Sequence, residues 1–149
     1  MSGELVIRPL QPEDRVRWAP LWEGYLTFYK SALPAEITDL TFARFFDALE
    51  PMHALVAEQN GRLIGLVHYM VHRSTWAKNN YCYLEDLFVD PNIRGKGVGR
   101  ALIAAVVDAA RAAGSSRVYW ITHETNAQAQ ALYNKVADRP GFIQYRIKL

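Results

Sequence analysis

With 149 residues, half of them apolar and 21% charged, the chain fits a single domain, residues 1–149, that buries a core of its own. Its net charge of +2 provides no basic footprint for nucleic acid, and every stretch free of Asp, Glu, Lys and Arg is much shorter than the roughly 20 residues that span a bilayer, so we expect neither a nucleic acid nor a membrane as partner. Cys82, the only cysteine, cannot form a disulfide within the chain, and Glu4 interrupts any apolar export signal, which predicts a cytoplasmic protein.

The first third of the chain predicts one strand and two helices. Apolar residues from Leu5 to Pro9 predict a short strand, and aromatic side chains at three- and four-residue spacing predict a helix from about residue 14 to residue 30. Residues 31–39, which contain Pro34, are expected to form a loop. Thr41 then caps a short helix whose apolar side chains are Phe42, Phe45, Phe46 and Leu49.

Three extended runs occupy the middle of the chain. The runs 54–58 and 63–71 flank Asn60-Gly61, a pair that accepts positive φ and therefore predicts a β-hairpin. A third run, residues 81–89, ends at Asp90-Pro91. We therefore expect three strands here, the first two of them joined as a hairpin.

Helices and strands alternate in the remainder. A nearly all-apolar helix is predicted over residues 99–113, before Gly114, and another over residues 126–136. Strands are predicted over residues 118–122 and 141–149. The order β α α β β β α β α β predicts an α/β (α+β) fold, a mixed and mostly antiparallel sheet with helices on both faces.

The segment between the third extended run and the apolar helix holds three alternate glycines. Glycine lacks a Cβ, so the backbone approaches a ligand closely there, and the helix that starts here leaves its first N–H groups unpaired and partially positive. These features together predict an anion site for phosphate groups. The residues that form it are Arg94, Gly95, Lys96, Gly97, Val98, Gly99 and Arg100.

Two common phosphate-binding motifs do not fit this segment. A P-loop requires Ser or Thr directly after Gly-Lys, and the dinucleotide fingerprint requires the spacing G-x-G-x-x-G after the first strand of a βαβ unit. Here no Ser or Thr follows, and the glycines are alternate and come late in the chain. A plain glycine-rich turn with solvated basic side chains is the alternative without a ligand.

Motifs in two other segments accompany the glycines. Arg94-x-x-Gly97-x-Gly99 is followed by Asn126-x-x-Ala129-x-x-Leu132-Tyr133 and then by Gly141-Phe142. Together with the order of elements, this pattern resembles the GNAT superfamily of N-acetyltransferases over essentially the whole chain, nearest to its histone- and polyamine-acetylating branches. The resemblance implies the GNAT-type acyl-CoA N-acyltransferase fold, with acetyl-CoA as co-substrate.

The resemblance also assigns contacts to acetyl-CoA. It implies that backbone amides of residues 95–100 hold the pyrophosphate and that Leu87, Phe88 and Val89 pair with the pantetheine amides as another strand would. It further implies that Asn126 reaches the pantetheine arm from the other side.

The chain departs from the family pattern after the second motif. Residues 134–140 are longer than the usual connection, and the chain has room for one strand after its last helix where family members commonly have two. One sheet edge would then lie open, and a partner subunit is one way to cover it. We therefore predict a homodimer.

Two residues are candidates for moving protons. Tyr133 lies seven residues after Asn126, two helical turns along, and a phenol keeps its proton at neutral pH, so it is the candidate acid for the departing sulfur. Glu85 is the candidate base for the acceptor ammonium, because strand alternation places it on one face and Asp86 on the other. The alternatives are a core tyrosine and a glutamate paired with an arginine.

The resemblance implies an acetyl-CoA-dependent N-acetyltransferase, and the sequence predicts no metal site. His68 and His72 are four apart in a strand, which is no metal-ligand spacing. The acceptor is a primary amine on a small molecule or peptide (a polyamine, a lysine of a basic protein or peptide, or another small amine), acetylated by direct transfer in a ternary complex. A non-catalytic acyl-CoA-binding sensor or scaffold module is the alternative function.

Overall fold

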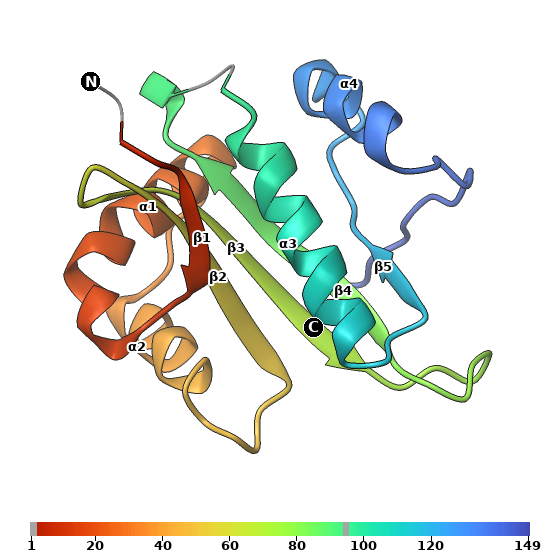
Figure 1. The fold of residues 1–149 in the computed structure, drawn as a ribbon. Helices are drawn as coiled ribbons and strands as arrows, with labels where there is room; N and C mark the ends of the chain where they lie inside the picture. The colour runs from red at the N-terminus through yellow and green to blue at the C-terminus, as the bar shows by residue number, and fades with distance from the viewer. Residues whose placement is uncertain (1–2, 94–95) are drawn as a thin grey trace.

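The computed structural model describes residues 3–93 and 96–149. Within these residues one five-stranded sheet has the order β1-β2-β3-β4-β5, with antiparallel pairs throughout except for the parallel pair β4–β5 (Figure 1). The strands are β1 (Val6–Pro9), β2 (Met52–Gln59), β3 (Arg62–His72), β4 (Tyr81–Val89) and β5 (Arg117–Tyr119). The predicted mixed, mostly antiparallel α+β architecture is confirmed.

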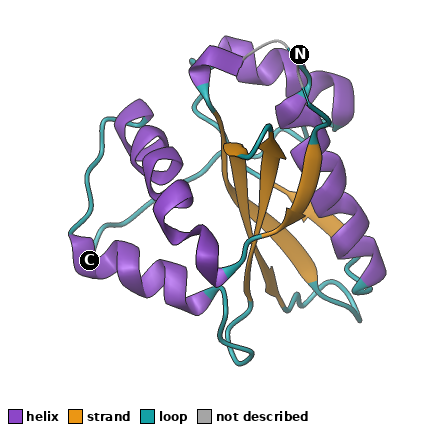
Figure 2. Ribbon diagram, turned by 60° about the vertical axis from the view of Figure 1, so that its left-hand side comes forward, coloured by secondary structure: helices purple, strands orange, loops and turns teal. Residues whose placement is uncertain are grey.

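Helices cover both faces of the sheet (Figures 1 and 2). They are α1 (Arg15–Phe28), α2 (Ala35–Arg44), α3 (Val98–Ala112) and α4 (Ala127–Val136), with short 3-10 turns at Pro12–Asp14 and Pro91–Ile93. One core packs α1 and α2 against the sheet around Trp18 and Leu66, and the other packs α3 around Leu102 and Val106. No helix among the described residues is long and apolar enough to cross a bilayer.

The hairpin and the apolar helix form as predicted. Asn60 and Gly61 both have positive φ, 54° and 73°, and join β2 to β3. Helix α3 begins and ends within a residue of its predicted bounds, and its apolar stripe lies against the sheet. Gly65 on β3 allows this close approach, because a Cβ there would stand 3.1 Å from a methyl carbon of Leu102.

Two predictions for the first third of the chain are wrong. Residues 35–39, expected in a loop, form the start of α2, and Thr41 lies inside that helix instead of capping it. Pro34 stands at the N-cap position, where the fixed φ of proline suits a helix entrance and the missing N–H costs nothing. The proline therefore starts the helix instead of marking a loop.

The predicted final strand is also absent. Residues 141–149 have no regular secondary structure, and their large apolar side chains are almost fully exposed. Figure 2 shows this segment as a loop whose end lies at the margin of the molecule, away from the strands. The apolar pattern of a strand is present, but no strand of the described chain hydrogen-bonds with it. Strand β5 is shorter than predicted as well, three residues instead of five.

Candidate active site

Strand β4 loses one of its neighbours a third of the way along its length. Strand β5 pairs with β4 only from Tyr81 to Tyr83, whereas β3 pairs with β4 as far as Val89. Beyond Tyr83 the two strands diverge (Figure 1), so the second half of β4 presents an edge that β5 does not cover. The residues predicted to pair with the pantetheine, Leu87, Phe88 and Val89, lie on this edge.

A β-bulge at Glu85 marks the point of divergence. Asp86 is opposite His68 and Leu84 is opposite Tyr69, so Glu85 is an extra residue in β4. Cys82 and Leu84 on one side of the bulge pack in the α3 core, but Phe88 beyond it packs in the α1 core. The alternation therefore changes phase at the bulge, as bulges commonly cause.

This phase change overturns the prediction that Glu85 and Asp86 occupy opposite faces. Both carboxylates lie near Tyr25 of α1. Burial is the largest cause that raises the pKa of the Tyr25 phenol, and the negative charges of Asp86 and Glu85 raise it further. The side chain of Glu85 reaches solvent but is partly surrounded by other groups. This partial desolvation is the largest cause that raises the pKa of Glu85, and the charge of Asp86 is the second. Two acidic groups thus lie together on the α1 side of the open edge.

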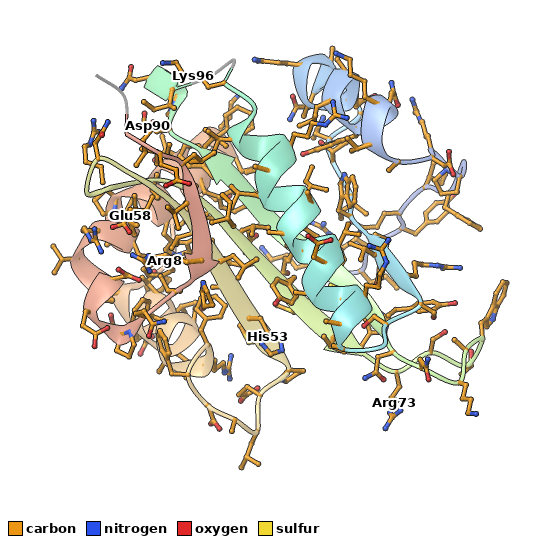
Figure 3. The ribbon with its side chains drawn as sticks, viewed as in Figure 1. Arg8, His53, Glu58, Arg73, Asp90 and Lys96 are labelled. Carbon is orange, nitrogen blue, oxygen red and sulfur yellow. The ribbon has the colours of Figure 1, made fainter. Side chains whose placement is uncertain are left out.

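The open edge of β4 leads to the start of α3. Gly97 precedes this helix with φ of 74°, and Val98 is buried at its first position. Lys96 and Arg100 are exposed beside these backbone groups, and Figure 3 shows Lys96 at the same end of the molecule as Asp90, the residue that follows β4. Arg94 and Gly95, also predicted to contact the pyrophosphate, lie outside the described residues.

These features fit the groups of acetyl-CoA. The first N–H groups of α3 have no partner within the helix and carry its positive dipole end, and two cationic side chains flank them. At Gly99 a Cβ would stand 3.8 Å from Val89 and 3.6 Å from Leu132 of α4, so this helix start lies close to both β4 and α4. A diphosphate at the helix start and an amide-bearing arm along β4 suit this donor set.

Tyr133 on α4 stands on the far side of the edge from the two carboxylates. Its ring packs edge-on against Trp120 with centroids 5.3 Å apart. Burial is the largest cause that raises the pKa of the Tyr133 phenol, and the neighbouring phenol of Tyr29, at the end of α1, raises it further. The phenol is therefore protonated over the whole neutral range. Asn126 caps α4, its Oδ1 accepting from the N–H of Ala129 at 3.3 Å.

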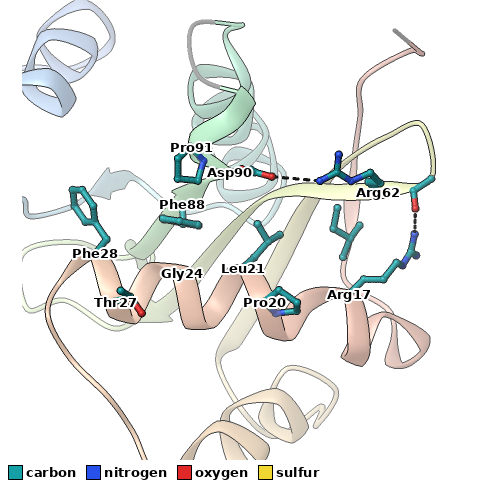
Figure 4. A pocket seen from close by; sticks show the side chains of 12 residues that line it. Arg17, Pro20, Leu21, Gly24, Thr27, Phe28, Arg62, Phe88, Asp90 and Pro91 are labelled. Atoms are coloured by element: carbon teal, nitrogen blue, oxygen red, sulfur yellow. Dashed lines mark hydrogen bonds and ion pairs between the residues drawn. The ribbon is translucent and has the colours of Figure 1, made fainter. Parts of the chain in front are cut away.

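A groove of about 650 Å³ runs along α1 next to the end of β4. Figure 4 shows Phe28 and Gly24 of α1 facing Phe88, with Arg17 and Arg62 at the other end, where Arg62 lies 3.6 Å from Asp90. Gly24 is needed for this approach, because a Cβ would stand 2.9 Å from the Phe88 ring. The groove lies on the α1 face of β4, the face that carries the carboxylates.

One buried group near the site was missed by the sequence analysis. His68 lies between Trp18 and Asp86 and hydrogen-bonds to both. Its partners are 50 and 18 residues away, so no local spacing indicates the contact. In the described part of the chain, no group of three or more His, Cys, Asp or Glu side chains is arranged to hold a metal ion.

An uncovered strand edge that ends at a glycine-led helix start, with a protonated tyrosine on one side and carboxylates on the other, is the arrangement expected of an acyl-CoA-dependent acyltransferase. The model of the acetyltransferase (GNAT) family matches residues 18–137. The chain therefore belongs to the GNAT family and is an acetyl-CoA-dependent acyltransferase.

Known proteins resemble the chain over most of its length. The D-amino-acid N-acetyltransferase HPA3 of Saccharomyces cerevisiae is 36% identical over 148 residues, which cover 98% of this chain and 92% of HPA3. The thialysine N-epsilon-acetyltransferase of Sus scrofa is 34% identical over 95 residues, 58% of this chain and 55% of that protein. The aminoglycoside N-acetyltransferase AAC(6')-Iy, solved with a bisubstrate analogue, shares the fold with a TM-score of 0.86 over 99% of both chains at 18% identity.

Proposed function

We propose that the protein transfers the acetyl group of acetyl-CoA to a primary amine, on a small molecule or a peptide, by direct transfer in a ternary complex. The observation that carries this proposal is the open edge of β4, which runs from the start of α3 to a point between Tyr133 and Glu85. The relatives named above, acting on D-amino acids, thialysine and aminoglycosides by their names, support an amine as acceptor. Polyamines, lysine side chains and other small amines are the candidates.

Acetyl-CoA supplies the activated thioester, and the chain binds and orients it. In our proposal the α3 amides from Gly97 to Arg100, with Lys96 and the undescribed Arg94 and Gly95, hold the diphosphate. Leu87, Phe88 and Val89 hydrogen-bond with the pantetheine amides through the backbone, and the amide group of Asn126 contacts the arm from α4. The open edge of β4 supports the strand-like contacts.

Glu85 and Tyr133 divide the proton transfers in this proposal. At pH 7, freeing the lone pair of an amine with a pKa near 10.4 costs about 4.6 kcal/mol, so a base gains most on the acceptor side. Glu85 takes one proton of the ammonium through water, which frees the lone pair to attack. As the N–C bond forms and the C–S bond breaks, Tyr133 donates its proton to the sulfur, and the second proton of the nitrogen returns to the phenolate through water. The raised pKa values of both groups suit these roles, since Glu85 accepts more readily and Tyr133 stays protonated.

The exposed segment 141–149 supports the proposal of a homodimer. From residue 143 on, its odd positions are Ile143, Tyr145, Ile147 and Leu149, each at least 78% exposed, and polar residues lie between them. Such alternation is the pattern of a strand with one buried face. An edge of the sheet in a second copy would provide that face, because exposed apolar surface of this kind is costly in water.

Titration calorimetry with acetyl-CoA, followed by a thiol-release assay on a panel of amines, tests the function. We expect binding, and turnover with at least one polyamine, lysine peptide or amino acid. The variant Lys96→Met should raise the Kd for acetyl-CoA about ten-fold, as expected for the loss of a charge-assisted phosphate contact. Lys78→Met, at another exposed lysine, is the matched control. Binding without turnover on any amine would instead support the sensor alternative, and no binding would contradict both.

A further inference from the structure

A chain of buried hydrogen bonds ends on the carboxylate of Asp86. Trp18 Nε1 lies 3.1 Å from His68 Nε2, and His68 Nδ1 lies 2.9 Å from Asp86 Oδ2. Trp18 is 0% exposed and His68 is 1% exposed. The chain therefore connects α1, β3 and β4 without water, directly behind the bulge that carries Glu85.

The donors in this chain fix the protonation state of His68. An indole N–H donates a hydrogen bond and cannot accept one. His68 Nε2 must therefore accept from Trp18 and carries no proton, which leaves the proton on Nδ1, from where it is donated to Asp86. A doubly protonated imidazolium would place two N–H groups against each other. Trp18 thus holds His68 neutral, in a single tautomer.

A neutral His68 leaves the charge of Asp86 without compensation. Within residues 3–93 and 96–149, no lysine or arginine lies within ion-pair distance of this carboxylate, which is 9% exposed. Its other neighbour is the phenol of Tyr25, whose ring stacks on Trp22 at 5.3 Å. A buried anion without a cation is costly, so the fold maintains a site that a positively charged group would stabilise.

We propose that Trp18 and His68 are positioning residues that orient the carboxylate of Asp86, and leave it without a cation of its own, as the binding group for the ammonium of the acceptor. This inference rests on the proposed acetyl transfer to an amine. Asp86 follows Glu85 directly and faces α1, where Tyr29 lies near both Asp86 and Tyr133. An ammonium held by Asp86 is therefore next to the proposed base and on the path toward the proposed acid.

Several other ionisable groups surround His68 and Asp86. Tyr25 and Tyr29 face this pair from α1, and Tyr83 and Glu85 from β4. The guanidinium of Arg15 lies over the Trp18 ring, 5.4 Å from its centroid, and pairs with Asp39 at 2.6 Å. Two cations lie further out, Arg15 and Arg146, the second of which acts on Tyr83. In the described chain neither forms an ion pair with Asp86, whose one contact with a basic side chain is His68 at 2.9 Å.

Nitrogen NMR of His68 in the whole protein tests the protonation state without any turnover. We expect the spectrum of a ring that carries its proton on Nδ1 and none on Nε2 at pH 7. In Trp18→Phe the Nε2 atom loses its donor, so His68 should gain a second proton at this atom as the pH is lowered from 8 to 6. A doubly protonated ring in the wild type at pH 7, or a ring that stays neutral in Trp18→Phe, would overturn the inference.

Steady-state kinetics test the role of the chain in acceptor binding. The imidazolium formed in Trp18→Phe would compensate Asp86, so kcat/KM for the acceptor should fall at least ten-fold more between pH 8 and pH 6 than in the wild type, while the KM for acetyl-CoA stays unchanged. Trp22→Phe is the matched control. It removes another buried indole from the same helix, but its N–H donates to Thr38, so the pH profile should keep its wild-type shape.

A second pair of variants separates orientation from packing. His68→Asn can keep a donor near the position of Nδ1, whereas His68→Gln places its amide near Nε2, so we expect the asparagine variant to keep the lower KM for the acceptor. Equal KM values in the two variants, or parallel pH profiles of Trp18→Phe and Trp22→Phe, would show a structural role only. A wild-type protein that acetylates no amine would contradict the proposed function. The NMR experiment would still test the position of the proton on His68, because it needs no turnover.

Discussion

Glu85 combines a raised pKa with a position on the bulge of β4. Burial and the charge of Asp86 raise its pKa above the ordinary glutamate value of 4.5. Because the ionised form is the base, kcat/KM should fall as the pH drops through this raised pKa, so the acid limb of the pH profile lies above that of an ordinary glutamate. Glu85→Gln should remove this limb and lower kcat/KM for the amine about 100-fold.

The exposed Glu13, in the turn before α1, provides the control for this measurement. Glu13→Gln should keep the wild-type pH profile. If Glu85→Gln retained both its kcat/KM and the acid limb, the base would lie elsewhere, and Asp86 would be the first residue to examine.

At the residue scale, the sequence singles out a candidate group when its position depends on near neighbours. Glu85, Tyr133 and the α3 glycines stand out because strand, helix and loop patterns place them locally. The side of the sheet on which Asp86 lies could not be predicted, because the bulge is set by how β3 and β4 pair. The bond from Trp18 to His68 joins residues 50 positions apart, and only the folded chain brings them together.

At the scale of elements, four charged side chains fasten β1 and the start of α1 to β2. Arg8 lies 2.8 Å from Asp14 and 3.1 Å from Glu58, and Arg17 lies 2.7 Å from each of the same two carboxylates. Figure 3 shows Arg8 and Glu58 on neighbouring strands at the α1 side of the molecule. The network fixes the start of the helix that carries Trp18.

Asp14→Asn should destabilise the fold by about 2 kcal/mol at pH 7. Hydrogen bonds from Arg8 are the largest cause that lowers the pKa of the buried Asp14 from 3.8 to about 2, and nearly two units correspond to about 2 kcal/mol. Because the pKa of Asp14 is lower in the folded protein, its ionised carboxylate stabilises the fold above pH 3.8. This stabilisation is lost as the pH falls toward 2. Urea unfolding at both ends of this range measures the change.

The exposed Asp108, 3.8 Å from Arg111 on α3, provides the comparison. Asp108→Asn should change the free energy of unfolding by less than about 0.5 kcal/mol, as is usual for surface pairs. An equal effect of the two substitutions would mean that the Asp14 network contributes no more than a surface pair.

Gly97 links the stability of an element to its ligand. It has φ of 74°, and a Cβ added there would meet no atom within 4 Å beyond its chain neighbours; Gly114, past the end of α3, has φ of 84° in similarly open space. Alanine at either position should therefore cost about 1 kcal/mol of stability through backbone strain alone. Only Gly97→Ala should also raise the Kd for acetyl-CoA, about five-fold, equivalent to about 1 kcal/mol.

Calorimetry on the two alanine variants decides between strain and a role in binding. Equal Kd values for Gly97→Ala and Gly114→Ala would contradict the placement of the diphosphate at the start of α3.

The elements themselves were predictable where one face is strongly apolar. The stripe of α3 and the Asn60-Gly61 hairpin define their own bounds. Helix α2 was misplaced because Pro34 indicates a break and a helix entrance equally well from sequence. The segment 141–149 has the pattern of a strand but no hydrogen-bonding neighbour in the sheet, and a pattern does not specify which chain supplies the partner.

At the scale of the whole molecule, the last described segments pack lightly. Helix α4 has no fully buried residue, and only Leu132, Tyr133 and Val136 of this helix contact the α3 core as partly buried side chains. The candidate acid therefore lies on an element that the rest of one chain holds weakly. A second copy that covered residues 141–149 would also fix the position of α4, so we expect the oligomeric state and kcat to change together.

Light scattering on the whole protein at micromolar concentrations tests the dimer. One chain has a mass of 17.0 kDa, and we expect twice this mass. Ile143→Asp places a charge on the apolar side of the segment and should shift the mass to that of a monomer and lower kcat. Gln144→Asp adds the same charge on the polar side and should leave the dimer intact. A monomeric wild type would remove the proposed dimer. A monomeric Ile143→Asp variant with wild-type kcat would show instead that α4 holds Tyr133 in place without a second copy.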